Sequence, residues 1–444
     1  MVRGFDRTCS RRRLLGAGAA LAGGLALGRT ARSTAARALA AQERITLQVF
    51  IHANHPLDSV KALYEAKYPN VKLNYMEQSD MAVFRATLVA HGEGTPDLVR
   101  PEINDIQDLG KTGVLLDVTD LIEKHQAELA PGKVAECFIP ATGTYAAFPA
   151  EIGAVGLYYR QDLWQEAGVS VPADWTWDDY VEAAKTVKGK TGAASFYFPS
   201  SGDNQTALLW TYVMFQFGGS ITNADGTEVT LDDDKGIAAM EQVKKIYDAD
   251  VSLDEPPFEE TYFQALAAGQ VAGAPLPAGY RGFAIEPYVT DEQGGLGQWR
   301  VALLPRPAEG TVRVANIGGA ALASTRYTKY PQEVKNFMEL ALGTMEGATA
   351  CGEWGVVPSF LPYLASDAWK NARSEPFGDF AFNAVWTEAV NQYPGTWYMQ
   401  PVFAEALNEL GAQMMPMMDG EVEIAAGMKM VGDRVRDLNK RYQS

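Results

Sequence analysis

Residues 156–185, GLYYRQDLWQEAGVSVPADWTWDDYVEAAK, are the stretch that decides how this chain folds. The apolar run at 155–159 predicts a buried strand, and a short helix follows it and stops at Gly168. Thr176 is suited to be a helix N-cap, and Asp179, three residues later, can complete a capping box. The helix after this cap should bury one face, formed by Tyr180, Ala183, Ala184 and Val187.

Strand, short helix, proline loop and capped helix in this order resemble the extracellular solute-binding proteins of bacterial ABC importers, in the subfamily that mostly binds sugars. The pattern there is G-hydrophobic-x-Y-N-x-D-L-x-x-x-A-G followed by P-x-T-W-x-E. This chain departs from that pattern in having Arg160 in place of the pattern's Asn and Asp179 in place of its Glu, and it has Asp178 at the variable position after the Trp. It keeps Gly156, Tyr159, Asp162, Leu163, Ala167, Gly168, Thr176 and Trp177. The resemblance covers nearly the whole mature chain.

The rest of the first half alternates strands and helices. Apolar runs at 45–51, 71–76 and 97–99 predict strands, and the segments between and after them predict helices at 56–68, 81–91, 103–110 and 119–129. Such alternation is typical of an α/β fold with parallel strand pairs. The resemblance implies a periplasmic-binding-protein type II-like fold, in which two α/β lobes are joined by a multi-crossover hinge.

Three crossovers between the lobes set the expected domain boundaries. We place them near 145–151, at 317–323 and at 354–358. The N-terminal lobe then comprises 41–150 plus 313–353, and the C-terminal lobe 151–312 plus 354–444.

Residues 1–40 are predicted to be a cleaved export signal. Arg11 and Arg12 precede a Gly- and Ala-rich apolar run, which resembles a twin-arginine signal. The run at 14–28 is too short to span a bilayer, and the segment 38–40 offers a small-x-small cleavage site. We therefore expect a periplasmic protein.

Composition excludes some partners. The 444 residues carry a net charge of −17. Without the eight arginines and one aspartate of residues 1–40, there remain 30 basic and 54 acidic residues, a net charge of −24. Such an excess of acid opposes binding to nucleic acid or to anionic lipid.

Motifs for cofactor or metal chemistry are weak. His52 and His55 are spaced as a metal site could use, but an ordinary loop accounts for them. We expect no cofactor and no metal. Cys137 and Cys351 could form a disulfide in an oxidising compartment, although two buried thiols are favoured.

Candidate ligand-binding residues are polar or aromatic residues that follow strands, because ligands of two-lobed α/β proteins bind beyond the carboxyl ends of strands. Carboxylates and amides suit the hydroxyls of a sugar, and aromatic rings suit its C–H faces. In the N-terminal lobe the candidates are His52, Asn54, Gln78, Asp80, Glu102, Asn104 and Asp105. The resemblance implies a sugar-contacting acid in the third of these loops, a role that Asn104 or Asp105 fits. The chain lacks the Asp-basic or Asp-aromatic pair that the family often has there.

The C-terminal lobe contributes Asp203, Asn204, Trp210, Tyr280, Trp354, Trp397 and Tyr398 as candidates. Tyr280 occupies the place where the resembled family typically has a stacking Trp. Trp210 lies on an apolar helical face with Val213, Met214 and Phe217, which also suits a core residue. Alternatively, Asp203 could have a structural role alone, as a helix N-cap.

The function expected from the resemblance is that of a receptor, not an enzyme. Such a receptor captures a sugar, oligosaccharide or polyol and delivers it to the membrane permease of an ABC transporter; we expect a monomer. One alternative is an anionic or modified sugar, because Arg100, Arg160, Arg281 and Arg313 lie near predicted strand ends. A second alternative is a secreted carbohydrate-active enzyme.

Overall fold

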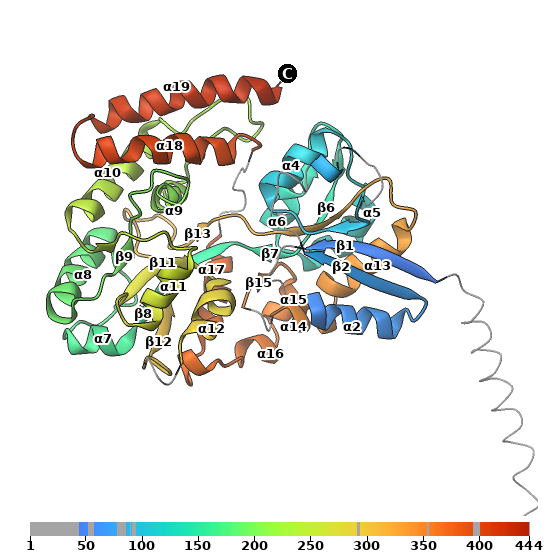
Figure 1. Cartoon of the computed structure of the whole chain (residues 1–444), viewed down its shortest axis with the longest axis horizontal. Helices are drawn as coiled ribbons and strands as arrows, with labels where there is room; N and C mark the ends of the chain where they lie inside the picture. Colours follow the sequence, from blue (N-terminus) through green and yellow to red (C-terminus); the bar gives the residue numbers. More distant parts are fainter. Residues whose placement is uncertain are drawn as a thin grey trace, which may run out of the picture.

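The computed structural model describes two α/β lobes joined by three crossing segments (Figure 1). The residues that it describes are 44–51, 57–77, 86–88, 90, 95–290, 294–352, 355–393 and 400–443. The predicted signal at 1–40 lies outside them.

The first lobe is built on a five-stranded sheet of order β2-β1-β3-β14-β6. Its strands are β1 (Ile45–Ile51), β2 (Val71–Glu77), β3 (Leu98–Val99), β6 (Ala147–Pro149) and β14 (Ala321–Ser324). β1 pairs in parallel with both β2 and β3, whereas β14 runs antiparallel to β3 and to β6. The carboxyl ends of the three parallel strands therefore meet at one edge of the sheet, as the sequence predicted.

Helices pack on this sheet through apolar faces. Tyr64 is fully buried on α2, meets the ring of Phe337 edge-on at 5.3 Å and donates a hydrogen bond to the carbonyl of Glu333. These contacts attach α2 to α13. The lobe contains α2 (Leu57–Lys67), α4 (Ile103–Lys111), α5 (Thr119–His125), η1 (Gln126–Glu128), α6 (Pro131–Glu136), the hairpin of β4 (Phe138–Ile139) and β5 (Thr144–Tyr145), α13 (Pro331–Leu342) and α14 (Met345–Gly352).

The second lobe is organised around β8 (Ala154–Arg160), the strand at the start of the motif. Six of its seven residues are buried, because strands pair on both sides of it and helices cover its faces. β8 pairs antiparallel with β11 (Gly273–Pro277), β12 (Trp299–Ala302) and β13 (Ala315–Asn316).

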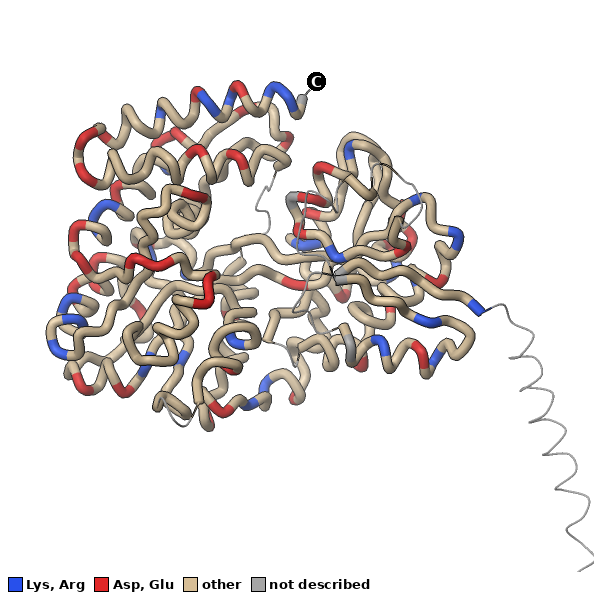
Figure 2. Tube along the Cα trace, viewed as in Figure 1, with Lys and Arg blue, Asp and Glu red and all other residues tan. Residues whose placement is uncertain are grey.

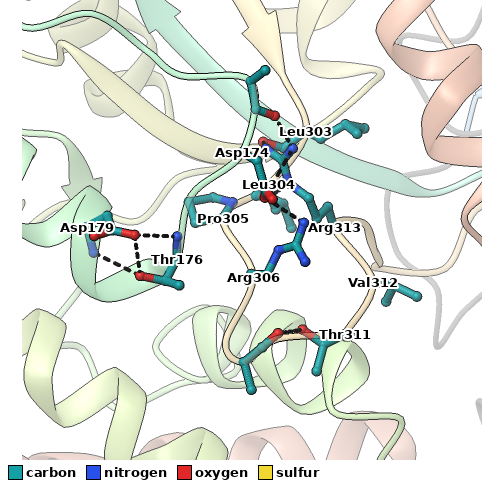
Figure 3. A network of polar contacts seen from close by, with 12 residues as sticks. Asp174, Thr176, Asp179, Leu303, Leu304, Pro305, Arg306, Thr311, Val312 and Arg313 are labelled. Atoms are coloured by element: carbon teal, nitrogen blue, oxygen red, sulfur yellow. Dashed lines mark hydrogen bonds and ion pairs between the residues drawn. The ribbon is translucent and has the colours of Figure 1, made fainter.

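The capping box predicted after β8 is confirmed. The Thr176 hydroxyl accepts a hydrogen bond from the backbone N–H of Asp179, and the Asp179 carboxylate accepts one from the backbone N–H of Thr176 (Figure 3). This box begins α8 (Trp177–Thr191), which ends at Gly192 with a φ of 77°. α8 buries Tyr180, Ala184 and Val187 as predicted.

Most of the remaining elements belong to this second lobe, although the two short helices at 361–370 pack against α14 of the first lobe. These remaining elements are α7 (Gln161–Glu166), β9 (Phe196–Tyr197), α9 (Leu208–Gln216), α10 (Asp234–Asp248), β10 (Ser252–Leu253), α11 (Glu260–Ala267), η2 (Arg281–Ile285), α12 (Glu286–Tyr288), α15 (Leu361–Leu364), α16 (Asp367–Lys370), η3 (Glu375–Phe377), α17 (Phe382–Asn391), α18 (Phe403–Met418) and α19 (Ile424–Gln443). The pair α18 and α19 covers α10 at the outer end of the lobe (Figure 1).

The three crossing segments are hydrogen-bonded to one another. β7 (Glu151–Ile152) pairs with β15 (Val357–Pro358), and Ile317 N–H donates to the Gly153 carbonyl at 2.9 Å. A side chain at Gly319 would lie 2.6 Å from the Glu151 carbonyl, and its φ is 94°. Close packing of the segments therefore requires glycine there. The chain leaves the second sheet at Asn316 and joins the first at Ala321, slightly beyond the expected boundary at 312/313.

Both predicted mature cysteines, Cys137 and Cys351, are buried and unpaired. No helix among the described residues is long and apolar enough to cross a membrane. Those same residues contain no cluster of three or more His, Cys, Asp or Glu arranged to hold a metal ion.

Candidate functional site

Glu102 lies where the carboxyl-end edge of the first sheet meets two crossing segments. It follows β3 by three residues and is the N-cap residue of α4. Its backbone forms a bridge with Ala320 of the second crossing segment, and the N–H of Ile103 donates to the Gly319 carbonyl. The sheet edge and the hinge thus hold Glu102 between them.

The carboxylate of Glu102 is exposed, and within the described part of the chain it makes no hydrogen bond or ion pair. Protein atoms crowd its inner side and displace water, and this desolvation raises the pKa of Glu102 above its ordinary value. The positive charges of Arg100 and Lys133 oppose the shift, and Glu151 adds to it. Glu102 is therefore an available hydrogen-bond acceptor in a partly enclosed place.

Arg100 forms an ion pair close to Glu102 that connects the first lobe to the hinge. Its guanidinium lies 2.7 Å from the Glu151 carboxylate, and both side chains are largely buried. Arg100 follows β3 and Glu151 belongs to β7, so this ion pair attaches the first crossing segment to the first lobe.

A second buried pair lies on α6. Lys133 contacts the Glu136 carboxylate and also donates to the Gly318 carbonyl at 2.8 Å. Desolvation raises the pKa of Glu136, and the ammonium of Lys133 opposes that rise. The other Glu136 oxygen accepts a hydrogen bond from the Tyr393 hydroxyl at 3.0 Å. The hinge is thus lined by charges that have internal partners.

Half of the residues predicted for ligand binding have no described position. His52, Asn54, Gln78, Asp80, Trp354, Trp397 and Tyr398 lie outside the described residues, as does the side chain of Asn104. The ends of β1 and β2 are described, and their parallel register brings Ile51 beside Glu77. The loops that carry the first four of these residues therefore begin at the same sheet edge as Glu102.

Asp105, expected as an alternative sugar-contacting acid, is only 2% exposed. It lies in the first turn of α4, where a carboxylate interacts favourably with the helix dipole. Of the two acids that follow β3, Glu102 is the one that solvent reaches.

Tyr280, which was expected to stack on a ligand, is instead packed inside the second lobe. Its side chain is fully buried, with the rings of Phe258, Phe263 and Phe283 centred within 4.9–6.0 Å of its own. Its hydroxyl donates to the carbonyl of Pro257. No face of the ring is accessible in this structure, so the stacking role is corrected to a core role. The sequence missed this because the partners of Tyr280 lie up to 23 positions away.

Trp210 is likewise core, because it is fully buried on α9 and its indole N–H donates to the Gly236 carbonyl at 2.9 Å. The expectation that it contacts ligand is corrected on the same ground. Asp203 is half-buried and accepts from the backbone N–H of Gln205 in the turn that precedes α9. The N-cap residue of α9 is Ala207, so Asp203 does not have the N-cap role considered for it. Asn204 is exposed beside it.

The four arginines that suggested an anionic ligand are all at most 8% exposed and occupied by internal partners. Arg100 pairs with Glu151 at 2.7 Å, Arg160 with Asp162 at 2.7 Å, Arg281 with Glu286 at 2.6 Å and Arg313 with Asp174 at 3.7 Å. Arg313 also donates to the carbonyls of Leu303 and Leu304 (Figure 3). These contacts leave none of the four as an uncompensated positive charge.

Sequence reasoning missed the polar groups at the hinge. Lys133, Glu136, Asn316 and Tyr393 come from three distant segments, and each occurs in a local pattern that also suits a surface residue. The one available signal was the pair of charged residues at i and i+3 in the otherwise small and apolar segment 130–137.

Comparison with known proteins gives consistent matches. Residues 40–348 match the family model of bacterial extracellular solute-binding proteins. The chain is 26% identical over 335 residues to an arabinooligosaccharide-binding protein of Bacillus subtilis, covering 72% of each chain. It is 28% identical over 265 residues to the protein of the same name from Halalkalibacterium halodurans, covering 56% of this chain and 55% of the relative.

Among solved structures, the ABC transporter-associated binding protein of B. animalis subsp. lactis Bl-04, in complex with β-1,6-galactobiose, superimposes with a TM-score of 0.75. The match is 22% identical and covers 90% of this chain and 98% of the other. This likeness confirms the expected type II-like fold of two α/β lobes.

Proposed function

Because the chain belongs to the family of bacterial extracellular solute-binding proteins, we propose that it is the exported receptor of an ABC importer for a neutral sugar or oligosaccharide. The ligand binds between the lobes, and the loaded receptor delivers it to the membrane permease. The observation that carries this proposal is the exposed Glu102, whose carboxylate has no partner among the described residues, at the sheet edge beside the hinge.

Glu102 suits a sugar because a carboxylate can accept hydrogen bonds from two neighbouring hydroxyls. A partly enclosed acceptor gains more from such bonds than one in bulk water. Glu102 therefore contributes to ligand affinity through its charge, and loss of that charge weakens binding.

The charge balance favours a neutral ligand over an acidic one. The arginines near the strand ends are paired with internal acids, while Glu102 adds a negative charge that has no ion-pair partner among the described residues. Figure 2 shows acidic residues spread over the outer helices of both lobes, interspersed with basic ones. A uronic-acid sugar would meet repulsion at Glu102 without a described free cation to offset it.

Export, transport and the absence of catalysis belong to the same proposal. Residues 1–40 are the cleaved signal, and the mature chain acts as a monomer in the periplasm. Recovery of a chain that starts near Ala41 in the periplasmic fraction tests export. Binding without turnover is expected, since Glu151 and Glu136 are held in ion pairs rather than free to act as a second catalytic carboxylate.

The decisive experiment is calorimetric titration of the mature chain with arabinotriose, a set of neutral disaccharides and trigalacturonic acid. We expect stoichiometric binding of a neutral sugar, recovery of that sugar unchanged, and no binding of the acid. Glu102→Gln should weaken binding about 10-fold or more, because a hydrogen bond to a charged group contributes roughly 1.5–3 kcal/mol.

Glu123→Gln is the matched control, because Glu123 is exposed on α5 of the same lobe, away from the hinge. Equal affinity in the wild type and Glu102→Gln would remove Glu102 from the site. Hydrolysis of a sugar in excess would support the enzyme alternative, and binding of trigalacturonic acid alone would support an anionic ligand.

A further inference from the structure

A chain of buried polar groups begins in the first lobe at α6. Lys133 is completely buried, and its ammonium contacts Glu136 and donates to the Gly318 carbonyl. Glu136 is 7% exposed, so its carboxylate depends on protein partners rather than water. One of its oxygens faces Lys133, which leaves the other for a different partner.

That partner comes from the second lobe. Tyr393 follows α17, which packs against β8 and β12, and its ring lies 5.6 Å from that of Phe215 on α9. The Tyr393 hydroxyl donates to Glu136 at 3.0 Å. This single hydrogen bond therefore joins a side chain of one lobe to a buried carboxylate of the other.

The Tyr393 hydroxyl also forms a hydrogen bond with a residue at the start of the second crossing segment, Asn316. The Tyr393 hydroxyl accepts a hydrogen bond from the side-chain amide N–H of Asn316 at 2.6 Å, and the side-chain oxygen of Asn316 accepts one from Gly318 N–H at 3.0 Å. Gly318 has a φ of 129°, which few other residues adopt, and lies where the chain passes between the two sheets. A rotation of the lobes about this segment moves Tyr393 relative to Glu136.

We propose that Tyr393 and Glu136 form an interlobe latch that holds the lobes in the arrangement seen here and is released when they rotate apart. Tyr393 acts as a positioning residue: it sets the population of this lobe arrangement, with no contact to the ligand required. When the lobes rotate apart, the buried Glu136 carboxylate loses its hydrogen bond from Tyr393 and has little water to replace it. The bond therefore favours the lobe arrangement seen here.

The effect on ligand capture follows from this population shift and rests on the proposed function. A receptor whose binding-competent arrangement is less populated binds more weakly by the same factor. Tyr393→Phe keeps the ring and removes only the hydroxyl. We take the arrangement seen here as the binding-competent one, and on that premise we expect this variant to raise the dissociation constant for arabinotriose about 10-fold.

The test of the latch itself needs no ligand. Spin labels at Glu123→Cys on α5 and Glu241→Cys on α10, both exposed, report the distance between the lobes by double electron–electron resonance. In the mature chain Cys137 and Cys351 do not compete for label, because both are buried and burial raises the pKa of each thiol to about 12.

Tyr247→Phe is the matched control, because its hydroxyl also donates to a carboxylate, that of Asp419 at 2.8 Å, but both residues belong to the second lobe. We expect a shifted or broadened distance distribution in labelled Tyr393→Phe and an unchanged one in labelled Tyr247→Phe. Identical distributions in wild type and Tyr393→Phe, or an equal shift in the control, would overturn the latch.

The outcomes separate this inference from the proposed function. A shifted distance in a protein that binds none of the neutral sugars supports the latch and contradicts the receptor role for those sugars. Tight arabinotriose binding with an unchanged distance supports the receptor and refutes the latch. A denaturant melt of each variant confirms that the distances come from folded protein.

Discussion

Tyr280→Ala is expected to lower the free energy of unfolding by about 4 kcal/mol, because truncation of a buried aromatic ring costs roughly 3–5 kcal/mol. The ring is fully buried between three phenylalanines of the second lobe, so its removal leaves a cavity that they cannot fill without moving. The hydroxyl contributes separately. Tyr280→Phe should cost only about 1 kcal/mol, the typical net value of the hydrogen bond that it gives to Pro257.

Guanidinium chloride unfolding of the mature chain, followed by circular dichroism, measures both changes. Tyr327→Ala is the control, because its ring is 38% exposed and the substitution should cost less than about 1 kcal/mol. Titration with arabinotriose completes the comparison. If Tyr280→Ala lost about 30-fold or more in affinity (about 2 kcal/mol) while its stability stayed within 1 kcal/mol of wild type, the ring would stack on ligand and the core assignment would be refuted.

Three further substitutions probe the hinge and the packing of helices. Lys133→Met should destabilise the fold by about 3–5 kcal/mol at pH 8, because it leaves the Glu136 carboxylate buried without its cation. The pKa of Glu136 in the folded variant then rises further above its value in the unfolded chain. As pH falls through that raised pKa, Glu136 takes up a proton in the folded state, so the free energy of unfolding should recover. A loss of stability in denaturant melts that does not change with pH would contradict this. Gly411→Ala on α18 should cost more than about 1 kcal/mol, since a Cβ there would lie 1.9 Å from the Asp203 carbonyl oxygen. Gly189→Ala on α8, with open space around it, should instead stabilise by about 0.5–1 kcal/mol; equal effects in thermal melts would refute the distinction.

Local structure was largely predictable from the sequence. The strand expected at 45–51 is β1 with the same limits, and the capping box of Thr176 and Asp179 forms as expected. Such features depend on residues a few positions apart, whose periodicity and capping chemistry act within one element. The motif around β8 also indicated the two-lobed fold that the solved structures share.

What only the tertiary structure decided is which side chains meet across the chain. Tyr280 was predicted at the ligand because it occupies the place of the resembled family's stacking Trp, yet phenylalanines from two other segments and from the helix after it enclose it. Glu136 and Tyr393 are 257 positions apart and share a hydrogen bond. Burial and pairing of this kind depend on how the two sheets and the hinge are placed. Local sequence pattern does not identify which side chains meet in that arrangement, because the same residue types also suit exposed positions.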